Sequence, residues 1–111
     1  MDAKIRIKFR ERLDQEHAAL DAADAATQED RAPVELDQTS VGRLSRMDAI
    51  QQQAMASAQA RRRAGRRKAI SAALRRMDED EFGWCQLCGD EIPFARLDLD
   101  PCAANCVSCS N

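Results

Sequence analysis

Five cysteines near the end of the sequence are the residues whose types and spacing most directly predict chemistry. Cys85 and Cys88 form one Cys-x2-Cys pair, seventeen residues follow, and Cys106 and Cys109 form a second pair. Two thiolates three positions apart can face one point from a tight turn, and two such turns complete a tetrahedral site with Zn–S distances of about 2.3 Å. The spacing therefore predicts one structural zinc ion whose four positions are all filled by protein.

The fifth cysteine, Cys102, does not fit this pattern. It lies four positions before Cys106, and using it as a ligand would abandon the matched spacing of Cys106 and Cys109. We expect Cys102 to be a small apolar filler or a free thiol. A redox Cys-x2-Cys would need a βαβ context that the sequence does not offer. Because thiols that bind metal are typical of reducing compartments, we expect a cytoplasmic protein.

The rest of the composition gives little support for an enzyme or for a membrane protein. The 111 residues include three Phe, one Trp and no Tyr, and 32% of them are charged. The single histidine, His17, has no serine or cysteine partner implied by the pattern, so we do not expect catalysis. No run approaches the roughly 18 apolar residues of a membrane span, and no secretory signal is evident.

Two helices are expected to position the cysteines. Residues 3–29 contain neither Pro nor Gly and place Phe9, Leu13 and Leu20 at helical spacing. Pro33 interrupts this pattern, so residues 30–38 are predicted to form a turn. Residues 39–81 contain no proline and predict a second helix on the order of 60 Å long. A short turn favours antiparallel packing, although a single loosely paired helix with a frayed start stays open as an alternative.

The sequence therefore predicts an all-α fold, with an antiparallel, coiled-coil-like helical hairpin over residues 1–81 and a small four-cysteine zinc finger over residues 82–111. On the second helix, the seam is expected to include Leu44, Met47, Met55, Ala58, Ile70, Leu74 and Met77. Five side chains of the finger are expected to dock on the last three of these, namely Trp84, Ile92, Phe94, Leu97 and Leu99.

Charge is distributed unevenly along the two helices. Residues 61–76 contain no acid and form a basic patch of Arg61, Arg62, Arg63, Arg66, Arg67, Lys68, Arg75 and Arg76. Residues 11–37 contain nine Asp or Glu against two Arg. A hairpin that turns near residue 34 would place residues 61–68 beside residues 1–8. We therefore expect an acidic tip and a basic base, which the net charge of −2 conceals.

The last third of the chain, "DEDEFGWCQLCGDEIPFARLDLDPCAANCVSC", resembles the DksA/TraR family of bacterial transcription regulators. The matching features are the acidic run, Phe82-Gly83 followed by an aromatic residue and Cys85, Gly89, Glu91-Ile92, Arg96-Leu97, Pro101 and the cysteine spacing. The resemblance implies a factor that binds RNA polymerase rather than promoter DNA. In this family the hairpin enters the secondary channel of the polymerase, with acidic residues at its tip.

The tip motif of that family, Asp-x-x-Asp-x-Ala, is incomplete where the resemblance would place it. Ser45-Arg46-Met47 stands there, and Asp48-Ala49 follows. The best tip candidates are Asp37, Arg43, Arg46 and Asp48. A string containing Asp21, Asp24 and Ala26 does match the motif, but it belongs to the first predicted helix, and we interpret it as a solvated acidic face.

A second interpretation is a non-specific nucleic-acid-binding zinc protein that uses the basic helix from Arg61 to Arg76. Clustered arginine is typical of phosphate contact. No aromatic residue is interleaved for base stacking, however, and no base-reading motif is present, so we do not expect sequence-specific DNA binding. We favour a protein partner, bacterial RNA polymerase, bound by a monomer.

Overall fold

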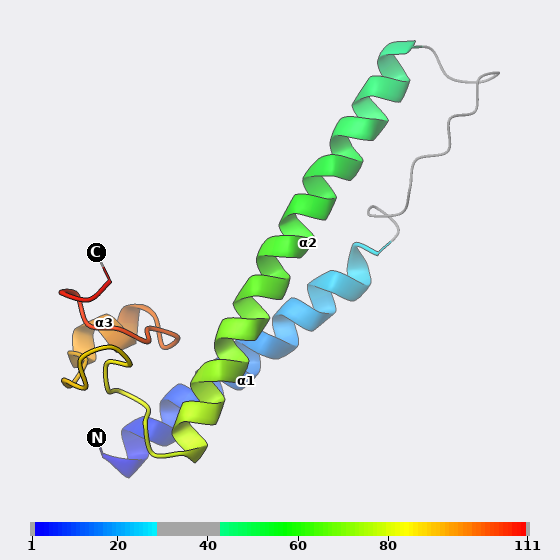
Figure 1. Cartoon of the computed structure of the whole chain (residues 1–111). Coiled ribbons are helices and arrows are strands. Elements are labelled where there is room, and N and C mark those ends of the chain that lie inside the picture. Colours follow the sequence, from blue (N-terminus) through cyan, green and yellow to red (C-terminus); the bar gives the residue numbers. More distant parts are fainter. Residues whose placement is uncertain (1, 29–42, 111) are drawn as a thin grey trace. The chain divides into compact units, whose positions relative to one another are not determined.

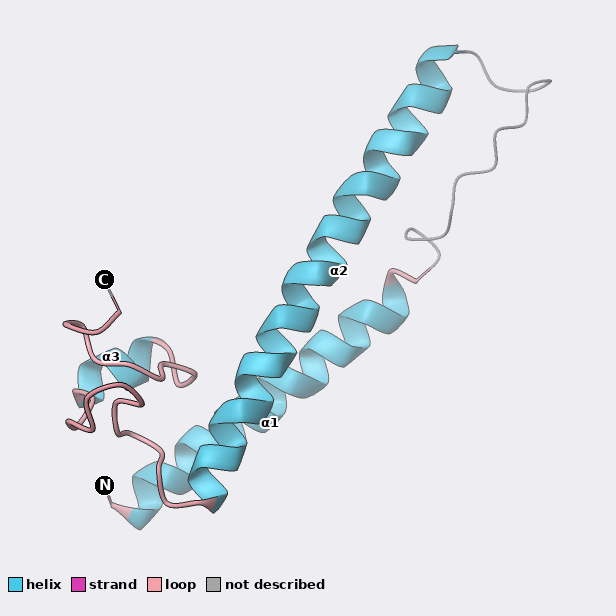
Figure 2. Cartoon of the chain, in the orientation of Figure 1, coloured by secondary structure: helices cyan, strands magenta, loops and turns pink. Residues whose placement is uncertain are grey.

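The computed structural model describes residues 2–28 and 43–110, with residues 43–45 described by their backbone alone. The described elements are α1 (Ala3–Ala26), α2 (Arg43–Asp78) and the short α3 (Phe94–Leu99) (Figure 1). Figure 2 shows helices and loops and no strand in this part of the chain, where one isolated antiparallel bridge joins Trp84 and Glu91. The all-α prediction is confirmed for these residues. None of the described helices is both long and apolar enough to cross a membrane.

Both long helices end earlier than the sequence predicted. The hydroxyl of Thr27 donates to the carbonyl of Ala23 at 2.8 Å, directly after the last residue of α1. After α2, Asp80 has a φ of 58°, and the N–H groups of Glu81 and Phe82 both donate to the carbonyl of Arg76, at 2.7 and 3.1 Å. A left-handed residue that redirects N–H groups to earlier carbonyls is a common way to end a helix. The turn predicted at residues 30–38 lies outside the described residues.

Residues 1–18 and 67–111 form one compact unit, called here the finger unit. Its core contains apolar side chains from both long helices and from the segment after α2, each at most 5% exposed: Phe9, Leu13, Ile70, Ala73, Met77, Phe82, Cys85, Ile92 and Leu97. The Phe9 ring lies 5.7 Å from that of Phe82 and 5.8 Å from that of Phe94. Leu13, Ile70 and Leu97 are the largest fully buried side chains.

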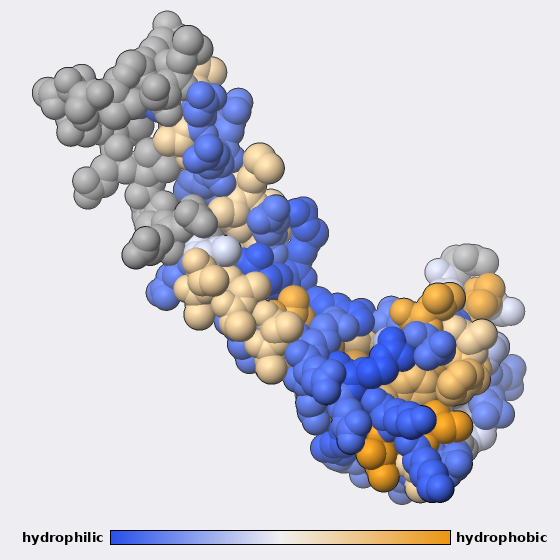
Figure 3. All heavy atoms as spheres, turned by 180° about the vertical axis from the view of Figure 1, so that it is seen from behind, coloured by the Kyte–Doolittle hydropathy of each residue, from blue (hydrophilic) through white to orange (hydrophobic). Residues whose placement is uncertain are grey.

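Of the five finger side chains that were expected to be buried against α2, two are buried. Ile92 and Leu97 are buried, as expected. Trp84, Phe94 and Leu99 remain 47%, 54% and 88% exposed, so the expected burial of these three side chains is wrong. Figure 3 shows hydrophobic residues, in orange, at the surface among hydrophilic ones, in blue. The physical reason is that about thirty residues form tight turns around the cysteines, and they can direct only a few side chains inward.

Ion pairs establish the antiparallel register of α1 and α2 in the finger unit. Arg6 pairs with Asp80 and Arg10 with Asp78, each at 3.0 Å. Arg6 also donates to the carbonyl of Met77 at 2.9 Å. These pairs are exposed and contribute little to stability. Because the earlier residue of α1 pairs with the later residue at the end of α2, the two helices must run in opposite directions.

The second compact unit contains residues 19–66, and it corrects the predicted register. Arg63 lies beside α1 near its end, because its Nε contacts Oδ1 of Asp24 at 2.7 Å and its Nη2 donates to Oγ1 of Thr27 at 3.0 Å. The prediction that residues 61–68 lie beside residues 1–8 is therefore wrong. It assumed a turn centred near residue 34, whereas α1 has 24 residues and α2 has 36.

Two further predictions on the same unit are corrected. The side chains of Asp24 and Arg63 are only 20% and 15% exposed, so Asp24 belongs to a largely buried ion pair rather than to a solvated acidic face. Met47 and Met55, expected in the helix seam, are 51% and 63% exposed. Ala58 is half-buried, in agreement with the seam.

Candidate metal centre

The structure brings the four predicted ligands together. The sulfur atoms of Cys85, Cys88, Cys106 and Cys109 all lie within 4.8 Å of one another. The Sγ atoms of Cys88 and Cys106 are 3.7 Å apart. In a tetrahedral site with Zn–S distances of 2.3 Å, neighbouring sulfur atoms would be about 3.8 Å apart. The four thiols therefore fit one tetrahedral metal ion with little movement.

Local hydrogen bonds build the first cysteine turn. The N–H of Cys85 donates to the carbonyl of Asp90 at 2.7 Å, and the N–H of Gly89 donates to the carbonyl of Cys85 at 2.9 Å. Gly89 has a φ of 78°, which side chains with a Cβ rarely adopt. No heavy atom lies within 4 Å of a Cβ built on Gly89, so backbone conformation rather than space favours glycine there.

The second cysteine turn is closed by the N–H groups of Cys109 and Ser110, which donate to the carbonyl of Cys106 at 3.1 and 3.0 Å. A further bond, from the N–H of Gln86 to the carbonyl of Ala104 at 2.9 Å, connects the two turns. Each pair of cysteines thus lies on its own tight loop, as the Cys-x2-Cys spacing predicted, and the backbone holds the loops against each other.

The crowded sulfur atoms influence one another's ionisation. Hydrogen bonding from the backbone of Cys106 lowers the pKa of Cys85 to about 6. Interactions with the thiols of Cys106, Cys88 and Cys85 raise the pKa of Cys109 to about 12. Four adjacent thiolates repel one another unless a cation lies among them, and a bound divalent metal would stabilise all four in the deprotonated form.

Cys102 lies outside this group of four sulfur atoms. It is half-buried, and its N–H donates to Oδ1 of Asp100 at 3.0 Å. Its carbonyl accepts a hydrogen bond from Arg76 at 3.4 Å. Its backbone therefore ties the loop before the second cysteine turn to α2.

Arg96, on α3, supports the second cysteine turn, a role that the sequence analysis did not assign. Its Nε donates to the carbonyl of Asn105 at 2.9 Å, and its Nη2 donates to Oγ of Ser110 at 3.1 Å. The two acceptors lie immediately before Cys106 and immediately after Cys109, so one guanidinium holds both ends of the turn. One feature of the sequence could have indicated this role, because Arg96 is the only Arg or Lys after residue 76.

Replacing Arg96 by alanine is expected to lower metal affinity by roughly 10- to 100-fold, the range typical of residues that orient metal ligands. Competition with a chromophoric chelator measures this change. Arg96→Lys should recover little of the lost affinity, because an ammonium group cannot reproduce the planar guanidinium, which donates to both acceptors at once. Arg75→Ala removes an exposed arginine of α2 and serves as the control. Equal affinities for the Arg96→Ala and Arg75→Ala variants would contradict the assigned role.

The other predicted site residues differ in how exposed they are. In the basic patch, Arg61, Arg62, Lys68 and Arg75 are exposed, whereas Arg63 is engaged by Asp24. The remaining members are half-buried, namely Arg66, Arg67 and Arg76.

The tip candidates are described only in part. Asp48 is exposed on α2, and Arg46 is half-buried. Arg43 is the first residue of α2, with its side chain not described. Asp37 lies outside the described residues.

Comparison with known proteins gives local sequence matches and one match in fold. No family model matches the sequence. Over 42 residues, the chain is 45% identical to the RNA polymerase-binding transcription factor DksA of Haemophilus influenzae, a stretch covering 38% of this chain and 29% of that relative. Identity to the protein of the same name from Escherichia coli is 38% over 42 residues, covering 38% and 28% of the two chains. The matched stretch thus spans less than a third of these curated relatives.

The fold is similar to that of transcription factor DksA2 from Pseudomonas aeruginosa, with a TM-score of 0.75 over 98% of this chain and 82% of the other, at 22% identity. Two long antiparallel helices with a four-cysteine cluster after them define a class of small helical proteins with a cysteine-ligated finger. The local sequence similarity to the DksA proteins is added to this likeness in fold, and both agree with the resemblance to the DksA/TraR family that the last third of the chain predicted.

Proposed function

We propose that this protein is a bacterial transcription regulator that binds RNA polymerase and inserts its helical hairpin into the secondary channel. The single observation that carries the proposal is the 45% identity with a protein named as an RNA polymerase-binding transcription factor. The similar fold of DksA2 supports the same architecture beyond the matched stretch. We further propose that the protein acts in the cytoplasm as a monomer and catalyses no reaction.

We propose zinc as the metal, one ion per chain, with a structural role. A tetrahedral set of four thiolates suits zinc or an iron–sulfur centre, and the separation of the sulfur atoms supports a single ion. Four protein ligands leave no position for water, so the metal would hold the two cysteine turns together and nothing more. Structural zinc contributes about 10–16 kcal/mol in small peptides, which is ample for a segment with few buried side chains.

Asp48 is the proposed effector residue of the hairpin. It is an exposed carboxylate in the first turns of α2. Asp24, in the string that matches the family's tip motif, is engaged by Arg63 at 2.7 Å and is less available for a partner. These two observations favour Asp48 over Asp24.

Asp48→Asn is expected to reduce the effect on transcription several-fold while changing polymerase affinity by less than about twofold, because it removes one exposed charge and no packing. In vitro transcription and a binding assay on the same polymerase measure the two quantities. Asp14→Asn, an exposed change on α1, is the control. If binding falls as much as the transcriptional effect, Asp48 is a docking residue and the effector assignment is wrong.

The nucleic-acid alternative receives less support after the register is corrected. Arg63 is neutralised by Asp24, and only four members of the basic patch are exposed. A protein that binds duplex DNA through arginines loses affinity steeply as salt increases. A steep salt dependence on DNA without capture of polymerase would favour this alternative over the proposed function.

A further inference from the structure

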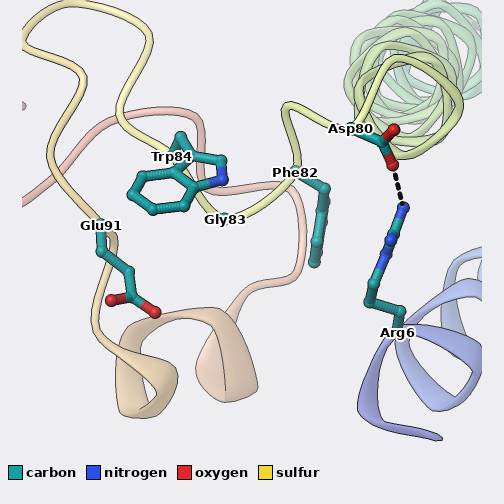
Figure 4. A pocket seen from close by; sticks show the side chains of 6 residues that line it. All are labelled: Arg6, Asp80, Phe82, Gly83, Trp84 and Glu91. Carbon is teal, nitrogen blue, oxygen red and sulfur yellow. Dashed lines mark hydrogen bonds and ion pairs between the residues drawn. The ribbon is translucent and has the colours of Figure 1, made fainter. Parts of the chain in front are cut away.

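The finger unit contains a small hollow beside the end of α2 that the proposed function does not use. Figure 4 shows the Trp84 indole and the Glu91 side chain at one end and the Asp80–Arg6 pair at the other. Phe82 and Gly83 complete the lining. Its volume is about 80 Å³, whereas one water needs roughly 10–15 Å³ by a comparable measure. The hollow can therefore accept a group of several heavy atoms.

Backbone hydrogen bonds hold the main chain at Trp84 in place. The N–H of Trp84 donates to the carbonyl of Glu81 at 3.3 Å, and the N–H of Ile92 donates to the carbonyl of Gly83 at 2.7 Å. The bridge between Trp84 and Glu91 keeps the two residues opposite each other. Although this backbone is held on both sides, the Trp84 side chain stays 47% exposed. A large aromatic side chain is thus presented to solvent from a backbone that is held on both sides.

The charge around the hollow is negative. Arg6 is engaged by Asp80 at 3.0 Å and by the carbonyl of Met77 at 2.9 Å, so its charge is already compensated. Glu91 is exposed and has no ion pair among the residues that the structure describes. The other acid of the lining, Asp80, is the partner of Arg6, so the net charge of the lining comes from Glu91. An aromatic face with an uncompensated carboxylate beside it favours a cation and disfavours phosphate.

We propose that this hollow binds an arginine side chain presented by a protein partner. The guanidinium would lie against the Trp84 indole, where cation–π attraction is strongest, and would donate hydrogen bonds to Glu91. Arginine is favoured over lysine because its planar group stacks on an indole and pairs with a carboxylate at the same time. Which protein supplies the arginine rests on the proposed function, and RNA polymerase is then the partner.

The single tryptophan of the chain allows a direct test. The zinc-loaded full chain carrying 5-fluorotryptophan should give one ¹⁹F resonance from the hollow. Titration with the peptide acetyl-Gly-Arg-Gly-amide is expected to move it, and the matched citrulline peptide, which is neutral, is not. Glu91→Gln should remove most of the shift, whereas Glu79→Gln, an exposed acid outside the lining, should not. Equal shifts with both peptides, or equal effects of both variants, would overturn the proposal.

A second arm measures binding to RNA polymerase. Glu91→Gln is expected to weaken binding by about three- to tenfold relative to Glu79→Gln, because it removes the charge that strengthens the hydrogen bonds to the guanidinium. Absence of wild-type binding would overturn the proposed function, while the peptide titration would still decide whether the hollow takes arginine. If the ¹⁹F resonance instead moves with protein concentration alone, the occupant is a second copy of the chain, and the assignment to another protein is wrong. Equal zinc content in all variants establishes that the finger is intact.

Discussion

Replacing Cys85 by serine is expected to abolish stoichiometric zinc binding and to unfold residues 82–110. Cys85 is 3% exposed, and its backbone closes the first cysteine turn. Losing one of four ligands removes much of a contribution of about 10–16 kcal/mol, a term as large as the whole stability of a typical domain. Metal analysis of the purified variant measures zinc per chain, and limited proteolysis measures the loss of structure.

Cys102→Ser is the matched control for this experiment. It makes the same chemical change at a half-buried cysteine outside the sulfur cluster, and one zinc per chain should remain. A Cys85→Ser protein that kept full zinc and resisted protease would contradict the assigned ligands. Loss of zinc from both variants would show that Cys102 is also required.

Ile70→Ala is expected to lower the free energy of unfolding of the zinc-loaded protein by about 2–5 kcal/mol, because it leaves a cavity at a fully buried position. Urea unfolding followed by circular dichroism measures the change. Ile50→Ala makes the same substitution on the same helix at a side chain that is 46% exposed, and it should cost less than about 1 kcal/mol. Equal costs would contradict a core confined to the side chains buried in the finger unit.

The metal centre was predictable because its determinants are local. Two Cys-x2-Cys pairs specify two turns, and together these turns supply the four thiols that one tetrahedral site requires. Cys102 was separated from the ligands by the same spacing argument. Arg96 was not found, because its partners, the carbonyl of Asn105 and the hydroxyl of Ser110, are brought to it only by the folded chain.

The helices were predictable from the absence of proline and from apolar periodicity, but their register was not. A helical pattern leaves the pairing of two helices undetermined until the turn between them is placed. Pro33 suggested a turn near residue 34, which would pair residues 61–68 with residues 1–8. The contact between Arg63 and Asp24 shows a different pairing. Exposure of Trp84, Phe94 and Leu99 was also missed, since hydrophobicity alone does not tell which side chains a short, tightly turned segment can direct inward.

The proposed binding of this chain to RNA polymerase through the secondary channel is tested most directly by a competition assay on purified bacterial polymerase. The zinc-loaded protein, labelled at its N-terminus, is allowed to bind core polymerase, and an unlabelled protein known to enter the secondary channel is then added. The competitor is expected to displace the labelled chain fully. Binding that persists at saturating competitor, or no binding to polymerase at all, would contradict it.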